Sequence, residues 1–112
     1  MHELGITRSI VSIVEEAAAG RRVVRVTLDV GRLAGVVPEA LAFCFDVVSK
    51  GTALDGARLD INEIPGRCRC RDCGGEFEAN VLYQACGCGS RNVERVAGDE
   101  LKIREMELEE AA

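Results

Sequence analysis

Two pairs of cysteines in the second half of the chain have a spacing typical of metal ligands. Cys70 and Cys73 are separated by two residues and followed by Gly74, and Cys86 and Cys88 come after twelve intervening residues. Two thiolates three positions apart can bind one ion, and the glycine allows backbone N–H groups to turn toward sulfur. Four thiolates from two such turns make the closed tetrahedral set of a structural site. We therefore predict one structural Zn(II) bound by Cys70, Cys73, Cys86 and Cys88.

The choice of ligands and metal leaves alternatives open. A regular second pair would need a cysteine at position 85, where the chain has Ala85, and Cys68 is a fifth candidate two residues before Cys70. Cys68 can therefore replace one of the four predicted ligands. Iron is an alternative metal, because rubredoxin-type sites use similar pairs. Disulfides or a thiol redox switch are alternatives that need no metal.

The other cysteine and the neighbouring arginines have simpler interpretations. Cys44 lies among the apolar residues of a predicted helix, so we expect a small buried thiol rather than a ligand. Arg67, Arg69 and Arg71 alternate with the first cysteines. We expect solvated charges that offset the negative charge of the thiolates. The alternative is that they lower thiol pKa values or contact an anionic partner.

His2 is the chain's only histidine and lies at the amino terminus. The Met1 α-amine, the His2 amide and the His2 imidazole can form fused chelate rings around one ion, and the Glu3 amide nitrogen can complete a square plane. Square-planar nitrogen ligation suits Ni(II) or Cu(II) rather than zinc. It requires deprotonated amides, so binding strengthens as the pH rises. The alternative, and the more common case, is a terminal histidine without a function.

Composition argues against several classes of protein. The chain has 112 residues, no Trp, one Tyr, three Phe and a formal net charge of −5. Nucleic-acid-binding proteins need positive charge and stacking surfaces, so we expect no nucleic-acid partner. No apolar stretch approaches the ~20 residues that span a bilayer, and the start lacks the basic segment of a secretory signal. We expect a cytoplasmic protein with reduced thiols and no membrane partner. We also expect no enzymatic activity, because no base accompanies a nucleophile.

Hydrophobic periodicity predicts the elements that carry these residues. The first helix runs to about Gly20, and residues 24–30 then alternate with period two, as in a strand with one buried face. Pro38 opens a second helix that ends near Gly51. The predicted apolar face of the first helix consists of Leu4, Thr7, Val11, Val14 and Ala18, widened by Ile6, Ile10, Ile13 and Ala17.

The rest of the chain adds two strands and an insert. Residues 58–64 alternate as a second strand, whereas residues 67–97 hold five cysteines and show little periodicity. A last strand begins at Leu101, and the phase slip before Met106 predicts a bulge. The predicted fold is α/β, a small domain of two helices on a three-stranded sheet, with an inserted zinc-ribbon-like module. The α/β domain is assigned to residues 1–66 and 98–112, and the zinc-binding module to residues 67–97.

These features together resemble one known family. Met1-His2-Glu3-Leu4 opens a helix, and a Cys-x-x-Cys-Gly motif and a second cysteine pair ending in Gly-Ser follow. This arrangement closely resembles HypA/HybF, the nickel metallochaperone family of hydrogenase maturation. The similarity covers the whole chain, including Val37 to Leu41 at the second helix and Gly98 to Ile103 at the last strand. The combination is specific, although the first motif alone is weak.

The resemblance implies a transferable Ni(II) site with His2 as the essential ligand and Glu3 beside it. It also implies a separate structural zinc on the four cysteines predicted above. The implied partners are the GTPase HypB and the large subunit of [NiFe]-hydrogenase, and some family members also serve urease maturation. The alternative is a zinc ribbon that binds protein or nucleic acid, which is favoured by Arg67, Arg69, Arg71, Arg91 and Arg95.

Overall fold

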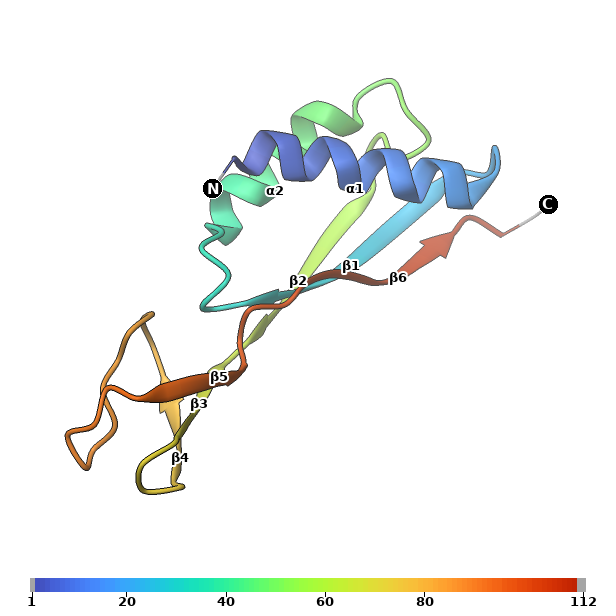
Figure 1. Cartoon of the computed structure of the whole chain (residues 1–112). Coiled ribbons are helices and arrows are strands. Elements are labelled where there is room, and N and C mark those ends of the chain that lie inside the picture. The colour runs from blue at the N-terminus through green and yellow to red at the C-terminus, as the bar shows by residue number, and fades with distance from the viewer. Residues whose placement is uncertain (1, 111–112) are drawn as a thin grey trace.

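The computed structural model describes residues 2–110, which form two helices and two three-stranded sheets. The molecule is elongated, with extents of 58 × 25 × 17 Å. Figure 1 shows both helices on the first sheet and the second sheet extending from one end of it. The predicted α/β fold with an inserted cysteine module is confirmed. The elements are α1 (Glu3–Ala18), β1 (Val23–Gly31), α2 (Pro38–Ser49), β2 (Arg58–Ile64), β3 (Gly66–Cys70), β4 (Glu76–Ala79), β5 (Val93–Ala97) and β6 (Leu101–Leu108).

The first sheet has the order β2-β1-β6, with β1 in the centre. β1 pairs with β2 in parallel and with β6 in an antiparallel register. A parallel pair needs a crossover connection, and α2 supplies it. α1 and α2 cover one face of the sheet and leave the other without a helix (Figure 1). The core between helices and sheet includes Val26, Leu28 and Val30 from β1 and Leu41 and Phe45 from α2.

The two helices follow the predicted periodicity with local differences. Pro38 stands in the first turn of α2, where its missing N–H leaves no helical bond unmade. The buried face of α1 is narrower than predicted, because Leu4 and Ile13 are exposed. Cys44 is half-buried rather than fully buried. Leu41 and Phe45 occupy the centre of the buried face of α2, and Cys44 lies at the edge of that face.

The predicted bulge in the last strand is present. Thr27 of β1 lies opposite Glu105, whereas the next residue, Leu28, lies opposite Ile103, so Arg104 is the extra residue of β6. A bulge changes which face of the sheet the following side chains occupy. It therefore explains why both Ile103 and Met106 pack against the core although they are three positions apart.

The second sheet has the order β4-β3-β5, and both pairings are antiparallel. Along β3, Cys68 and Cys70 are buried while Arg67 and Arg69 are exposed. The expectation of little periodicity is therefore wrong for β3, because its arginines and cysteines alternate with the period of a strand. Leu33, which follows β1, is buried in the small core of this sheet with Cys68 and Ala79.

Three glycines lie where the two sheets meet. Gly31 ends β1, Gly66 begins β3, and Gly98 stands between β5 and β6. A Cβ atom at Gly98 would lie 2.5 Å from the Gly66 Cα, and one at Gly31 would overlap the Gly98 carbonyl group. Gly98 also has φ +107°, a conformation that favours glycine. The backbones therefore approach too closely for side chains. The Gly31 N–H donates to Glu100 O at 2.7 Å and the Leu33 N–H to Gly98 O at 2.7 Å.

Candidate metal centre

Two turns bring four cysteine side chains together. Cys70 ends β3 and Cys73 lies in the following turn, which is closed by a hydrogen bond from the Gly74 N–H to Cys70 O at 2.8 Å. A second turn between β4 and β5 carries Cys86 and Cys88, and the Gly89 N–H donates to Cys86 O at 2.9 Å. Gly74 and Gly89 have φ values of +77° and +92°, so each turn depends on its glycine.

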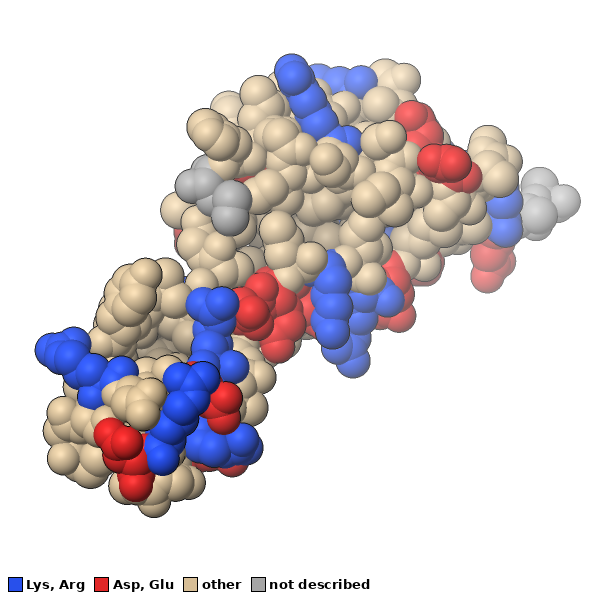
Figure 2. Space-filling model, in the orientation of Figure 1, with Lys and Arg blue, Asp and Glu red and all other residues tan. Residues whose placement is uncertain are grey.

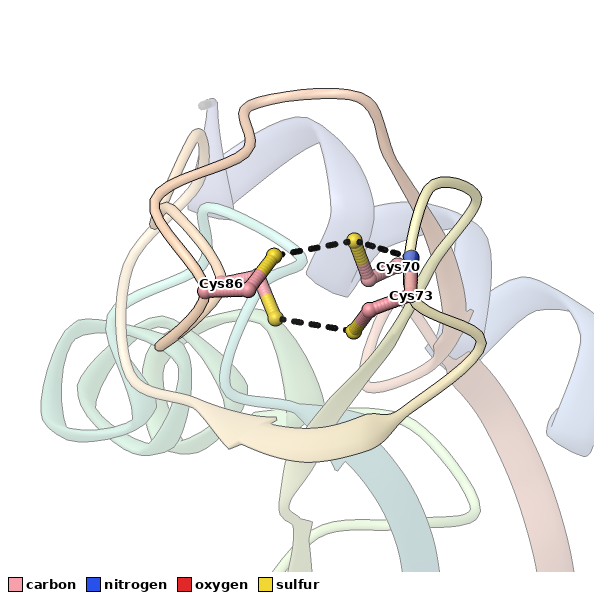
Figure 3. Close-up of side chains that lie close together, drawn as sticks. Cys70, Cys73 and Cys86 are labelled. Carbon is pink, nitrogen blue, oxygen red and sulfur yellow. Dashed lines mark hydrogen bonds between the residues drawn. The ribbon is translucent and has the colours of Figure 1, made fainter.

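The four sulfur atoms have the spacing of a tetrahedral metal site. All four Sγ atoms lie within 4.8 Å of one another. The Cys70–Cys88 and Cys73–Cys86 Sγ distances are both 3.7 Å, and Figure 3 shows the sulfurs of Cys70 and Cys73 facing the turn of Cys86. A tetrahedron with metal–sulfur bonds of about 2.3 Å has sulfur–sulfur edges of about 3.8 Å. The arrangement therefore fits a zinc-sized ion.

Backbone N–H groups surround the first pair of sulfurs. The Cys73 N–H donates to Cys70 Sγ at 3.4 Å, and the Gly75 N–H donates to Cys73 Sγ at 3.4 Å. Hydrogen bonds to sulfur favour the thiolate, which is the form that binds metal. The N–H of Cys73, followed by that of Asp72, lowers the pKa of Cys70 to about 6, against the opposing effect of desolvation.

The pKa of another thiol in the cluster moves in the opposite direction. A hydrogen bond from the Ser90 backbone lowers the pKa of Cys88, but the neighbouring Cys86 and Cys70 thiols outweigh it and raise that pKa to about 12. Four adjacent thiols cannot all ionise at neutral pH without a compensating positive charge, because like charges repel at this distance. The chemistry of the donor set therefore calls for a cation.

A polar network that sequence analysis missed joins the two turns. The Asp72 carboxylate accepts hydrogen bonds from the Ser90 hydroxyl and from the Asn92 amide, the latter at 3.3 Å. The Ser90 hydroxyl, followed by the Asn92 amide, lowers the pKa of Asp72. Asp, Ser and Asn commonly form such bonds in turns, so Asp72 within the first cysteine motif was the available signal.

The fifth candidate ligand lies elsewhere. Cys68 is buried in the small core of the second sheet beside Leu33 and is not one of the four clustered thiols. It lies opposite Phe77 on β4 and Arg95 on β5. Cys68 is therefore placed as a packing residue of β3, and Cys44 belongs to α2 of the first sheet.

The arginines that alternate with the first cysteines form ion pairs across the second sheet. Arg69 lies 3.2 Å from Glu76 on β4 and 3.3 Å from Glu94 on β5. Arg67 pairs with Glu76 and Arg71 with Glu94. These exposed charges are thus balanced by cross-strand carboxylates. That they also offset the charge of the thiolates stays a prediction.

The candidate nickel ligands lie at the start of α1. His2 is exposed and is the N-cap residue, and its carbonyl accepts a hydrogen bond from the Ile6 N–H at 3.1 Å. Within residues 2–110, no hydrogen bond or ion pair holds its imidazole. The Glu3 Oε2 accepts a hydrogen bond from the Val37 N–H at 3.2 Å. The bond from Val37 makes the largest contribution to lowering the pKa of the Glu3 carboxyl, and a bond from the Glu3 backbone N–H makes the second largest. Met1 lies outside the described residues.

One family model covers nearly the whole chain. The family model described as "Hydrogenase/urease nickel incorporation, metallochaperone, hypA" matches residues 1–108 of the chain. The chain belongs to the HypA family. The resemblance to this family that the sequence predicted is confirmed. The description of the family names nickel incorporation and a metallochaperone, and it names no catalysed reaction.

Individual HypA proteins match over nearly their full length. The hydrogenase maturation factor HypA of Nostoc sp. is 52% identical over 110 residues, which cover 98% of this chain and 97% of the relative. That of Geobacter metallireducens is 47% identical, covering 97% of this chain and all of the relative. The solution structure of the Ni metallochaperone HypA from Helicobacter pylori matches with a TM-score of 0.68 and 26% identity, covering 96% of this chain and 97% of that chain. In the part of the chain that the structure describes, neither helix is long and apolar enough to cross a membrane.

Proposed function

We propose that the chain is a nickel metallochaperone that binds Ni(II) at its amino terminus and delivers it for [NiFe]-hydrogenase maturation. The observation that carries the proposal is the separation of two donor sets of different kinds. His2 lies alone and exposed at the start of a helix, whereas the four thiols form a complete tetrahedral donor set at the turns of the second sheet. In Figure 1 the start of α1 lies next to α2, apart from the second sheet. An open site suits cargo, and a closed site suits a retained structural metal.

The proposed nickel ligands are the Met1 α-amine, the His2 amide and imidazole, and the Glu3 amide nitrogen. Their support is local helix geometry. The N–H groups of the first helical turn have no acceptor within the helix. Deprotonating the His2 and Glu3 amides therefore breaks no helical hydrogen bond, and the helix continues from the Ile6 N–H to His2 O bond onward. His2 is exposed, so the proposed site is open to solvent and to a receiving protein, which favours transfer.

The proposed zinc ligands are Cys70, Cys73, Cys86 and Cys88. When bound, zinc would neutralise the thiolates and hold the two turns together. The residues themselves prepare the site, because backbone N–H groups point at Cys70 and Cys73 and the Asp72 network joins the turns. We assign the zinc module to residues 67–97 and the nickel-binding domain to residues 1–66 and 98–112.

The proposed partners follow from family membership. A hydrogenase maturation factor acts on a hydrogenase, so we propose the large subunit of [NiFe]-hydrogenase as the recipient of nickel and the HypB GTPase as a helper. Urease maturation proteins are a second class of recipient, because the matching family model includes urease nickel incorporation. We place this function in the cytoplasm, without nucleic acid.

Nickel titration of modified amino termini tests the nickel site. Adding two residues before Met1 converts the α-amine into a peptide amide, so we expect the extended protein to lose most of its nickel affinity. His2→Ala removes the imidazole and should be equally damaging. Glu3→Ala keeps the backbone nitrogen and should reduce affinity less. The measurement is calorimetry on untagged protein at pH 7 to 8, where amide deprotonation favours binding.

Zinc content and helical signal in each variant are the controls. Both should match those of the unmodified protein, because the changed residues are remote in sequence from the cysteines. Full nickel binding by the extended protein would exclude the α-amine as a ligand. Full binding by His2→Ala would remove the imidazole from the mechanism and leave the zinc-ribbon binding module as the functional class.

A further inference from the structure

A second concave site opens on the cysteine module without involving the clustered thiols. It is a pocket of about 340 Å³ whose apolar floor includes Leu33, Cys68 and Val93. Arg91 and Arg95 also line it, and no carboxylate of residues 2–110 does. Pockets of this size that combine apolar surface with a few convergent polar groups commonly bind ligands. Its lining is therefore suited to a partially apolar, negatively charged ligand.

The rim of the pocket exposes a continuous apolar segment. Val81, Leu82 and Tyr83 are 60%, 45% and 86% exposed, and all three line the pocket. Side chains of this size, adjacent and exposed, are typical of interaction surfaces rather than of a monomer's ordinary surface. Tyr83 also has φ +68°, an uncommon conformation for a residue with a side chain.

Side-chain hydrogen bonds hold this segment in place. The Asn80 N–H donates to the Gln84 Oε1 at 3.0 Å, and the Gln84 Nε2 donates to Glu78 O at 3.4 Å. The Arg91 Nη1 donates to Tyr83 O at 3.4 Å. A loop fixed at both ends presents its apolar side chains at a lower entropic cost of binding than a free loop would.

Charge complementarity indicates the chemistry of the ligand. The whole chain carries a net charge of −5, yet the charged side chains lining the pocket are both arginines. On the face in Figure 2, the smaller lobe, which holds the cysteine module, carries several basic side chains with acidic ones among them. Arg91 makes no ion pair within residues 2–110, and Arg95 reaches only the exposed Asp99 at 3.4 Å. Arg91 therefore has no carboxylate partner among these residues, although one of its nitrogens bonds Tyr83 O. An outside carboxylate can pair with the rest of that guanidinium and can compete with Asp99 for Arg95.

We propose that this pocket docks a short acidic segment of a partner protein. One large apolar side chain, such as leucine or phenylalanine, occupies the pocket, and flanking carboxylates pair with Arg91 and Arg95. Tyrosine and arginine are the residue types that contribute most strongly to such interfaces. The chain's own acidic end is not the occupant, because Leu108 is paired with Val23 in the first sheet. The proposal does not rest on nickel binding.

The chain's one tyrosine makes the test direct. There is no Trp, and Tyr83 is the single Tyr, so its fluorescence reports on this pocket alone. The zinc-loaded protein is titrated with a blocked peptide that has one leucine flanked by two glutamates on each side. We expect a saturable change that weakens as salt is added. Two control peptides should bind at least about tenfold more weakly. One has lysines in place of the glutamates, and the other keeps the glutamates but has glycine in place of the leucine.

Charge reversal then locates the contact. Arg91→Glu and Arg95→Glu should each lower affinity for the glutamate–leucine peptide at least about tenfold, the loss of a charge-assisted hydrogen bond. Arg8→Glu, on the exposed surface of α1, is the matched control and should bind as the unmodified protein does. Arg91→Lys should recover part of the affinity. The zinc content of each variant shows whether its cysteine module is still folded. If a variant has lost its fold, the comparison of the three peptides on the unmodified protein still tests the proposal.

Four outcomes would overturn the proposal. Equal binding of the lysine-flanked peptide would remove charge complementarity, and unchanged affinity in both zinc-loaded glutamate variants would place the peptide elsewhere. Tighter binding of a single-stranded oligonucleotide through the same arginines would identify a nucleic-acid site. A dimer in sedimentation that Arg91→Glu dissociates would identify a second copy of the chain as the occupant.

Discussion

Asp29 is a nearly fully buried carboxylate on the sheet face that carries no helix. Its side chain is 5% exposed and lies 3.1 Å from the Arg104 Nη1. Asn62 donates to its other oxygen at 3.1 Å. These partners come from β2 and from the bulge of β6, so Asp29 joins all three strands of the first sheet. A buried carboxylate with two donors specifies strand register, because a slip would leave it unpaired.

Asp29 should make the stability of the first sheet sensitive to acid. The hydrogen bond from Asn62, followed by that from Arg104, lowers the pKa of Asp29 below its usual value of about 4. Its stabilising contribution is therefore complete above pH 4 and is lost as the pH falls through the lowered pKa. Asp29→Asn should be less stable than the unmodified protein at pH 7, and the difference should shrink below pH 4. Urea unfolding followed by circular dichroism at several pH values measures this.

The matched control for Asp29 is Asp46→Asn, on the exposed surface of α2. It should follow the unmodified protein at every pH. Zinc loss in acid affects all three proteins alike, so the differences between them isolate the carboxylate. A constant difference between Asp29→Asn and the unmodified protein from pH 7 to pH 3 would contradict the assignment.

At the scale of elements, the sequence predicted those helices, strands and turns whose conformation is determined by residues close together in the chain. Period-two alternation located β1 and β2, and the phase slip before Met106 located the bulge of β6. The thiol cluster was likewise predictable, because two cysteine pairs in tight turns carry their own geometry. β4 and β5 were not predictable, since their identity depends on pairing with β3. Contacts between distant segments, such as Leu33 with Cys68, leave no local signal.

The glycine junction should tolerate no side chain. A Cβ atom at Gly66 would lie 2.7 Å from the Leu33 side chain and would overlap the Ala79 carbonyl oxygen. We expect Gly66→Ala to destabilise the protein by about 1–3 kcal/mol through overpacking. Gly5→Ala is the control, because nothing lies within 4 Å of its Cβ position and alanine favours a helix by about 1 kcal/mol. Denaturant unfolding measures both, and equal stability of the two variants would show that the junction is adaptable.

At the scale of the whole molecule, the two sheets have very unequal cores. Among residues 2–110, the first core contains eleven buried residues, whereas the second contains Leu33, Cys68 and Ala79. A core of three buried residues cannot offset the chain entropy lost by ordering three strands. The second sheet therefore needs another source of stability, and the four-thiol cluster is placed to provide it.

Zinc removal should therefore unfold the two sheets unequally. We expect chelation, or Cys73→Ser, to collapse the amide dispersion of residues 66–97 in NMR spectra while the helical signal persists. Cys44→Ser should keep its zinc, since Cys44 lies outside the cluster. Loss of all helical signal on chelation would contradict independent folding of the first sheet. Persistence of the second sheet without metal would contradict the structural role of zinc.

The pairing of β1 with β6 also sets an order of events during protein synthesis. Arg25 on β1 bonds Glu107 on β6, 82 positions later. The cysteine module is complete once Ala97 has left the ribosome, whereas the first sheet waits for Leu108. Until then β1, the most buried strand, has one unpaired edge, which is a template for aggregation. A nascent chain from which Ala97 but not Leu101 has emerged would thus hold a complete set of cysteine-module strands beside an unfinished sheet, and its exposed strand edge lies in the part of the chain that was made first.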